Sequence, residues 1–398
     1  MGRIVTGTLM LLISFTFISC KETINGKESR NVVSIDSLLK IRYQKLLDYP
    51  VDSIGFPRSY TKETKEVFKV KPNDWTSGFY PGNLWQLYKL TGEEAFKSEA
   101  MAWTSFLEKE KTNGGTHDMG FKMYCSFGEG YDVAGNEEYK KVLLESAATL
   151  TTRFNEKVGS LRSWDFNKDI WEFPVIIDNM MNLELLFEAT KISGDSTFHK
   201  IAVQHANMTL KNHFREDNSS VHVVVYDSIS GLVKDKITHQ GFSDSSAWAR
   251  GQAWGIYGFT MCYRYTKDLN YLEQAKKTAD FFLNHKNLPE NGIPFWDFND
   301  PNIPNVIKDV SAATITASAL VELSSYTNEV SYLTYSEKVL NTLRSEKYIL
   351  SADTNAPFIL DHSTGNWPKK DEMNVPIVYA DYYFLELIFR INNSKLRY

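Results

Sequence analysis

The 398-residue sequence is poor in the residues that define several common classes of protein. Its three cysteines exclude a disulfide-rich scaffold and leave too few thiolates for a cysteine-rich zinc site. A formal charge of −5 provides no basic surface, so we expect no nucleic-acid partner. No phosphate-binding glycine loop, HExxH motif or GxSxG motif occurs, and the eight histidines show no metal-ligand spacing. We therefore expect no cofactor and no metal.

Aromatic residues, in contrast, are abundant, with nine Trp, 21 Tyr and 24 Phe. Together with a hydrophobic fraction of 42%, they provide enough apolar surface for a packed core, which excludes a largely disordered chain. The length allows two or three ordinary domains or one large helical barrel.

The N-terminus is typical of an exported bacterial lipoprotein. Residues 1–19 combine Arg3, an apolar run and a small residue, so we predict a signal peptide. Cys20 then stands where a lipid-acceptor cysteine is expected, and polar residues 20–35 form a tether. The alternative is an ordinary signal peptide with an incidental cysteine. The lipoprotein interpretation places the protein in the periplasm or at the outer membrane, with the lipid as its sole membrane contact.

Two alternating sets of helices are predicted for residues 36–398, which we interpret as one domain. The first set is amphipathic and covers 36–49, 91–107, 134–150, 193–210, 266–283 and 327–343. The second set is apolar on all sides and covers 82–90, 119–134, 175–191, 246–266, 311–327 and 378–391. Six outer helices around six inner ones make an all-α (α/α)6 barrel, and the strand-like segment 221–228 adds a small β-hairpin.

The inner helices of such a barrel run in one direction, so polar residues at their N-termini meet at one mouth. Asp309, and Ser243 with Asp244, stand where N-caps of inner helices are expected. Cys125 and Cys262 lie in apolar helical contexts and are predicted to be buried free thiols.

Asp178 is the most unusual of the candidate catalytic residues, because it is the sole ionisable residue between Phe173 and Leu183. Burial there would raise its pKa and let it hold a proton near neutral pH, as a general acid requires. The alternative is an aspartate satisfied by a helix end or an arginine. Asp118 precedes another apolar helix and is either an N-cap or a second carboxylate of the site.

Four further candidate residues each allow a structural and a functional interpretation. Trp75 and Phe79 form either part of the core or a stacking wall for a ligand. His222 is either a satisfied structural histidine or a ligand contact. Arg250 lies in an apolar helix and needs an anionic partner, which is either an internal aspartate or the carboxylate of a ligand.

Four motifs in this order resemble those of glycoside hydrolase family 88, the unsaturated glucuronyl hydrolases: DWTSGFYPG (74–82), HDMGF (117–121), IDNMMN (177–182) and THQGFSDSSAWARGQAWGIYG (238–258). The similarity extends from about residue 36 to residue 390. It implies an (α/α)6 barrel in which Asp178 is the general acid–base and Asp118 the second essential carboxylate. It also implies that the following residues contact the sugar substrate of such an enzyme: Trp75, Phe79, Trp164, His222, Thr238, His239, Gln240, Arg250 and Trp254.

The resemblance further implies a reaction, namely hydration of the 4,5-unsaturated uronic acid that lyases leave on glycosaminoglycan fragments of chondroitin, hyaluronan or heparin type. Two alternatives remain at this point. One is an unsaturated rhamnogalacturonyl hydrolase of family 105 type that acts on pectin fragments, and the other is a glycan-binding lipoprotein without turnover. Segment 361–374 either contacts sulfate groups of the substrate or is a solvated loop.

Overall fold

The computed structural model describes residues 1–2 and 34–395, and the statements below concern these residues. Cys20 and almost all of the predicted signal peptide and tether lie outside them, so those expectations stay predictions. Residues 35–398 form a unit of their own. Within the described part of the chain, no helix combines the length and apolarity needed to cross a membrane.

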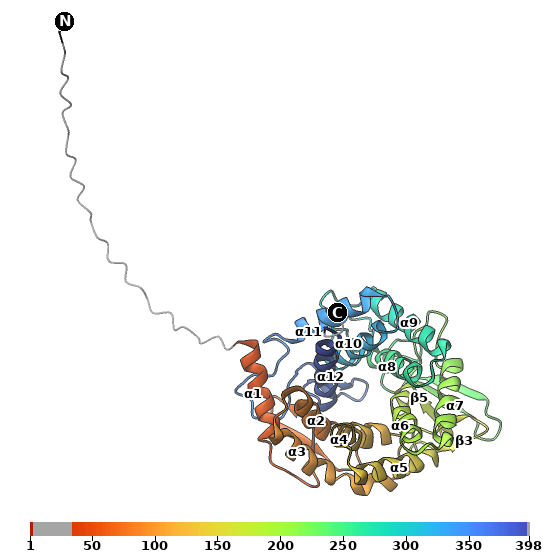
Figure 1. The fold of residues 1–398 in the computed structure, drawn as a ribbon. Coiled ribbons are helices and arrows are strands. Elements are labelled where there is room, and N and C mark those ends of the chain that lie inside the picture. The colour runs from red at the N-terminus through yellow and green to blue at the C-terminus, as the bar shows by residue number, and fades with distance from the viewer. Residues whose placement is uncertain (3–33, 396–398) are drawn as a thin grey trace. The chain divides into compact units, whose positions relative to one another are not determined.

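The described helices form two concentric rings (Figure 1). The outer ring consists of α1 (Ile35–Leu47), α3 (Glu94–Ser105), α5 (Glu137–Thr151), α7 (Ser196–Asn212), α9 (Leu269–Asn284) and α11 (Val330–Leu343). The inner ring contains α2 (Phe79–Thr91), α4 (Glu129–Ala134), α6 (Leu183–Ser193), α8 (Ala249–Thr266), α10 (Val310–Ser324) and α12 (Val378–Lys395). Because α12 packs against both α10 and α2, the inner ring closes, and the predicted (α/α)6 barrel is confirmed.

The inner helices pack closely because small residues line their contacts. Almost every residue of α10 is buried, and alanine, serine and threonine make up much of its sequence. Gly78 precedes α2, and a Cβ atom there would lie 2.3 Å from the carbonyl oxygens of both Phe121 and Lys122. Only glycine allows this approach between neighbouring inner segments. Cys125 and Cys262 are buried and free, as predicted.

Two of the predicted inner helices are interrupted at their N-terminal ends. Segment 119–134 begins as a π-helix, Gly120–Gly128, before α4. Segment 175–191 begins with strand β5 (Phe173–Ile176) and a 3₁₀-helix, Ile177–Asn182, before α6. The prediction of one continuous helix over 175–191 is therefore wrong. Its β-branched residues Val175 and Ile176 pair with another strand, a partner that helical periodicity does not reveal.

One predicted helix cap is confirmed and the other is wrong. The Asp309 side chain accepts a hydrogen bond from the backbone N–H of Ser311 at the start of α10. Ser243 and Asp244 do not cap α8, because that helix begins only at Ala249. The carboxylate of Asp244 instead accepts the backbone N–H of Thr238 at 2.8 Å and closes a loop.

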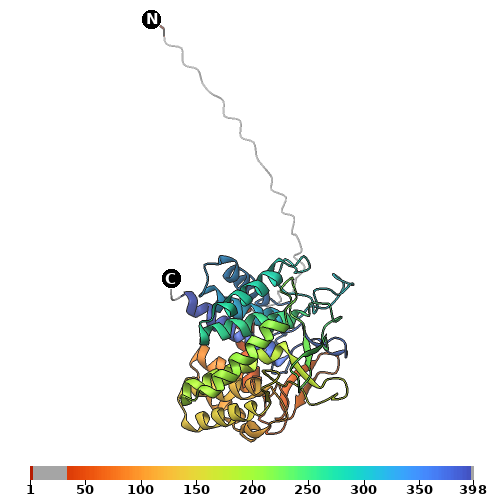
Figure 2. The ribbon, with the colours of Figure 1, turned by 90° about the vertical axis from the view of Figure 1, so that its right-hand side faces the viewer.

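The strands form small antiparallel sheets. The predicted hairpin is confirmed as β6 (Val223–Tyr226) and β7 (Val233–Ile237), and β5 extends it to a three-stranded sheet with Val175 opposite Val224. Three further strand pairs were not predicted: β1 (Phe56–Thr61) with β2 (Glu66–Val70), β3 (Phe154–Asn155) with β4 (Ser160–Leu161), and β8 (Ser363–Asn366) with β9 (Asp371–Val375). Figure 2 shows that the strands and long connections gather at the end of the barrel opposite the C-terminus.

Candidate active site

A cavity of about 290 Å³ opens at the strand-bearing end of the barrel. The site residues predicted from the sequence that line it are Trp75, Asp118, Trp164, Asp178, His239, Gln240 and Arg250. These side chains come from segments up to 175 positions apart in the chain, so the barrel brings together residues that the sequence separates.

The β5–β6 ladder positions Asp178. The backbone N–H of Ile177 donates to the carbonyl oxygen of His222 at 3.0 Å, which continues the strand pairing by one residue. Asp178 follows immediately in the 3₁₀-helix. As a result, its Oδ2 atom lies 3.7 Å from Nε2 of His222, and the carboxyl group is only 13% exposed.

Burial raises the pKa of Asp178 to about 7, although nearby Arg250 acts in the opposite direction. Burial also raises the pKa of Asp381 to about 7, so the pKa by itself does not distinguish the two residues. Both carboxylate oxygens of Asp381 accept backbone N–H groups, from Ile359 and Leu360. Asp178 instead has a buried oxygen, Oδ2, without a hydrogen-bond partner among the described residues, and its side chain lines the cavity. Asp178 is therefore the carboxyl group that is free to exchange a proton with a ligand.

His222 is held as a neutral imidazole beside this carboxyl group. Its Nδ1 atom accepts the backbone N–H groups of His239 and Gln240, at 3.0 and 3.1 Å. Because Nδ1 is the acceptor, the proton of the neutral ring is on Nε2, which faces Asp178. Burial lowers the pKa of His222 well below its usual value, so the ring stays uncharged at neutral pH. One ring nitrogen of His222 is thus satisfied structurally, and the other lies 3.7 Å from Asp178. His222 is not among the residues that line the cavity, and its contact with a ligand stays a prediction.

Asp118 lies on the neighbouring inner segment, just before the π-helix. Its Oδ2 atom accepts the hydroxyl of Thr116 at 2.9 Å, and its Oδ1 atom lies 3.2 Å from Nε2 of His117. The side chain therefore supports a local turn instead of capping the helix that follows, and at 15% exposure it still faces the cavity. Its negative charge contributes to the raised pKa of Asp178.

Arg250 has an internal anionic partner and also lines the cavity. Its Nη1 atom lies 2.9 Å from Oδ2 of Asp309, so an internal aspartate is one anionic partner of this guanidinium. The guanidinium also donates to the carbonyl oxygens of Thr364 and Gly365 in strand β8. Through these bonds Arg250 ties the β8–β9 hairpin to the inner helices.

The predicted aromatic residues lie in two layers. Trp75 and Trp164 line the cavity, whereas Phe79 and Trp254 are fully buried behind it. The rings of Trp75 and Phe79 meet edge to face at 6.0 Å. Trp254 contacts Phe121, which is part of the cavity wall, at 5.3 Å. In this structure Phe79 and Trp254 support the wall, and Trp75 and Trp164 form its surface.

Thr238, His239 and Gln240 form the connection after β7. The hydroxyl of Thr238 accepts the backbone N–H of Gly241 at 2.8 Å and stabilises this turn from outside the cavity. His239 packs against Trp164 at 5.2 Å, and Gln240 reaches the carbonyl oxygen of Gly365 at 3.3 Å. The turn therefore contributes both to the aromatic wall and to the opposite, hairpin side of the cavity.

Several residues of the cavity lining were not predicted individually: Arg58, Phe121, Phe166, Ile176, Asn366, Asp371 and Tyr379. Of these, Asn366 and Asp371 belong to segment 361–374, for which substrate contact was one of the two alternatives. Arg58 forms ion pairs with Glu372 at 2.7 Å and with Asp74 at 3.1 Å. More than 300 positions separate Arg58 from Glu372, and no local pattern signals such a pair. Among the residues that the structure describes, no group of three or more His, Cys, Asp or Glu side chains is placed to hold a metal ion.

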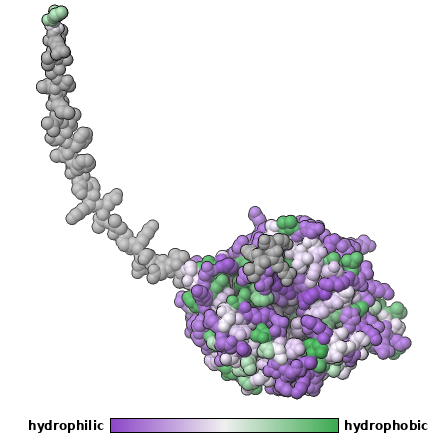
Figure 3. Space-filling model, viewed as in Figure 1, coloured by the Kyte–Doolittle hydropathy of each residue, from purple (hydrophilic) through white to green (hydrophobic). Residues whose placement is uncertain are grey.

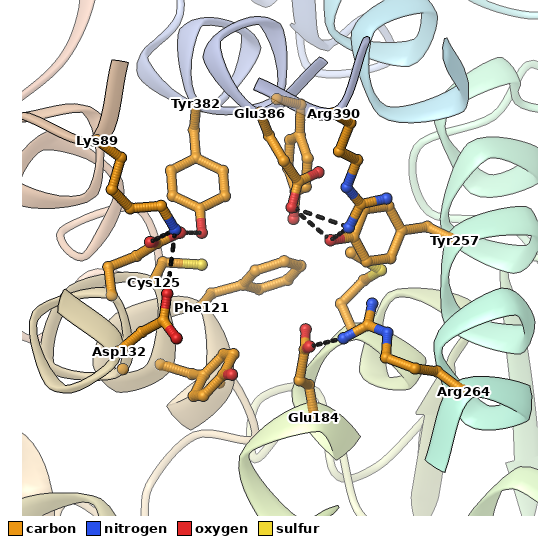
Figure 4. A pocket seen from close by; sticks show the side chains of 16 residues that line it. Lys89, Phe121, Cys125, Asp132, Glu184, Tyr257, Arg264, Tyr382, Glu386 and Arg390 are labelled. Atoms are coloured by element: carbon orange, nitrogen blue, oxygen red, sulfur yellow. Dashed lines mark hydrogen bonds and ion pairs between the residues drawn. The ribbon is translucent and has the colours of Figure 1, made fainter. Parts of the chain in front are cut away.

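A second cavity, of about 180 Å³, lies at the opposite end of the barrel, and Phe121 lines both cavities. Figure 3 views the molecule from this second end, where hydrophilic residues surround a central hollow. Figure 4 shows that its charged side chains point toward one another. Lys89 pairs with Glu129 at 2.7 Å, Arg264 with Glu184, and Arg390 with Glu386 at 3.1 Å.

The two cavities differ in how their polar groups are satisfied. None of the buried side-chain nitrogen and oxygen atoms that line the second cavity lacks a partner among the described residues. The first cavity contains such unpartnered atoms on Asp178 and Tyr379. Because unpartnered buried groups are costly unless a ligand or water satisfies them, the first cavity is the candidate active site.

Comparison with known proteins identifies relatives over the whole chain. The family model described as Glycosyl Hydrolase Family 88 matches residues 55–289. An unsaturated glucuronyl hydrolase of Formosa agariphila is 56% identical over 400 residues, which cover 100% of both chains. An unsaturated chondroitin disaccharide hydrolase of Streptococcus pneumoniae is 31% identical over 367 residues, 90% of each. A crystal structure of an unsaturated glucuronyl hydrolase specific for heparin has a TM-score of 0.88 and 43% identity, and the match covers 91% of this chain and 98% of that one.

Proposed function

The chain belongs to glycosyl hydrolase family 88, and we propose that it removes the 4,5-unsaturated uronic acid from the non-reducing end of glycosaminoglycan oligosaccharides produced by lyases. The relatives named above support this substrate class, and they include proteins described for both chondroitin and heparin fragments. Family membership favours a catalytic protein of the glucuronyl type over the pectin-directed and non-catalytic alternatives.

The chemistry that we propose is hydration of a vinyl ether. Asp178 donates its proton to C4 of the sugar, and positive charge develops on C5 and the ring oxygen. A water molecule then attacks C5 and returns one proton to the Asp178 carboxylate, so the residue ends the cycle as it began. The resulting hemiketal opens and releases the neighbouring sugar without a protein nucleophile, which distinguishes the reaction from retaining and inverting glycoside hydrolysis.

Other residues of the cavity bind the sugar and stabilise the charge in this proposal. Arg250 attracts the substrate carboxylate, and Asp118 orients the sugar hydroxyls and keeps the pKa of Asp178 high. Neutral His222 orients water or the Asp178 carboxylate through its Nε2–H group. The face of Trp75 or Trp164 stabilises the flat, cation-like ring.

The observation that supports this function most directly is a carboxyl group that lines the cavity, has a pKa of about 7 and has one buried oxygen without a hydrogen-bond partner among the described residues. The test is to incubate the purified protein with lyase-cut chondroitin, hyaluronan, heparin and pectin and to follow the ultraviolet absorbance of the unsaturated uronic acid. Loss of absorbance with one or more glycosaminoglycan fragments is expected. Activity confined to the pectin fragments, or none with any fragment, would refute the proposal.

We also propose that the protein is exported and anchored by a lipid on Cys20, in the periplasm or at the outer membrane. Support comes from the n-region, apolar run and cysteine of residues 1–20. Expression of the full chain with a labelled fatty acid should label the wild type and not Cys20→Ser. Equal labelling of both proteins, or of neither, would contradict the anchor.

A further inference from the structure

Phe166 is an exposed aromatic side chain at the cavity that the proposed chemistry does not use. It lines the cavity, yet 45% of the residue remains exposed. Its ring stacks on Trp164 with 5.1 Å between centroids and 28° between planes. Trp171 packs against its edge at 5.4 Å. The ring is therefore held in place by its neighbours while much of its surface stays open to solvent.

Phe166 also extends a row of rings that begins at the candidate acid. His222 lies 3.7 Å from the Asp178 carboxyl group, and its ring meets Trp164 at 5.8 Å. Phe166 then follows Trp164, and exposure increases along the row from buried His222 through partly buried Trp164 to Phe166. The unsaturated uronic acid that reacts at Asp178 is bonded to a second sugar. That second sugar would lie next to Trp164 and Phe166, the outer rings of this row.

The cavity lining also contains polar side chains. Asn366 and Lys369 of the β8–β9 hairpin region line the cavity, and Lys369 is exposed. The lining thus combines aromatic rings with hydrogen-bonding groups. This combination suits a pyranose, which has an apolar C–H face and a rim of hydroxyl groups.

We propose that Phe166 is the stacking surface for the second sugar, the leaving group of the reaction, and that it selects substrates with a pyranose at this position. This inference rests on the proposed function. Because the stacking contact is made before and during the reaction, its loss should raise KM and leave kcat nearly unchanged.

The test compares two substrates that share the unsaturated uronic acid, a disaccharide and the corresponding methyl glycoside. Phe166→Ala should lower kcat/KM for the disaccharide about fivefold, because KM rises while kcat stays nearly the same. For the methyl glycoside, kcat/KM should change by less than about twofold. Phe166→Tyr, which keeps the aromatic ring, should have nearly the wild-type kcat/KM for the disaccharide. Ile170→Ala is the matched control, because Ile170 lies in the same loop, is 71% exposed and does not line the cavity.

The outcomes separate this inference from the function on which it rests. If Phe166→Ala lowers kcat/KM equally for both substrates, or for neither, the proposed role of Phe166 is overturned while the proposed activity stands. A wild-type protein that leaves both substrates unchanged would overturn the proposed function and this inference with it. A raised KM for the disaccharide alone, restored by Phe166→Tyr and absent in Ile170→Ala, supports the stacking surface.

Discussion

Replacement of Asp178 by asparagine should abolish turnover and, at the same time, make the protein more stable at alkaline pH. The amide keeps the size of the side chain but cannot donate or accept the catalytic proton. General acid–base groups contribute about 10²- to 10⁴-fold to enzymatic rates, and we expect a loss of that size with the fold and substrate binding retained.

The gain in stability follows from the pKa of Asp178, which rises from 3.8 to about 7 on folding. An acid with a raised pKa in the folded state binds its proton more tightly there, so the wild type loses stability as pH rises from about 4 to about 7. At about 1.4 kcal/mol per pKa unit, ionising this buried carboxyl group costs about 4 kcal/mol in full. The difference in free energy of unfolding between Asp178→Asn and the wild type should therefore shift by about 3 kcal/mol in favour of the variant from about pH 5 to about pH 8.5.

Two assays check these expectations. Turnover is followed by the ultraviolet absorbance of an unsaturated disaccharide, and the free energy of unfolding by urea titration at both pH values. Asp132→Asn is the control, because that carboxylate is 72% exposed and lies at the second cavity. The reasoning is refuted if Asp178→Asn keeps more than about a tenth of the wild-type rate, since general acid–base catalysis is worth at least about 10²-fold. It is also refuted if the stability of the variant and that of the wild type change in parallel with pH.

Three further predictions concern pH, binding and packing. Because Asp178 must be protonated to act, kcat/KM should fall as pH rises above about 7, and a profile that stays flat into the alkaline range would contradict the proton-donor role. Arg250→Lys keeps the charge beside Asp309 but loses the planar guanidinium, so it should raise KM more than it lowers kcat; a change in kcat alone would argue against binding of the substrate carboxylate. Lys122→Met removes the only cation paired with the buried carboxylate of Glu110 among the described residues, at 2.9 Å, and should cost about 3–5 kcal/mol in urea unfolding; the double variant with Glu110→Gln should recover part of the loss, and an unchanged urea midpoint would contradict the pairing.

The helical architecture was predictable from the sequence because helix periodicity is a local signal. The segment 266–283 was predicted as an amphipathic helix, and α9 spans Leu269–Asn284. Likewise, 311–327 was predicted as a buried helix, and α10 spans Val310–Ser324. In each case the apolar residues that mark the buried face lie within a few turns of one another, so no knowledge of distant segments is needed.

The predictions failed where a distant segment decides the local structure. Residues 173–176 are apolar enough for a buried helix, but pairing with β6 draws them into a strand. Trp248 marks the start of α8 without a side-chain cap, and the first helical N–H, that of Ala249, donates to the carbonyl oxygen of Trp296 instead. Such partners are chosen by tertiary contacts, which periodicity and capping preferences do not encode.

The same division applies to the site. The isolation of Asp178 in an apolar run was visible in the sequence and correctly indicated a buried carboxyl group, because burial follows from the residues around it. Two facts became evident only in the folded barrel. Asp178 lines a cavity and keeps one buried oxygen without a hydrogen-bond partner beside neutral His222, whereas Asp381 uses both of its oxygens for backbone N–H groups. The pattern of apolar residues determines which surfaces are buried, but the chain's long-range packing determines which polar atoms are left without a partner, and those atoms are the ones that can bind a substrate.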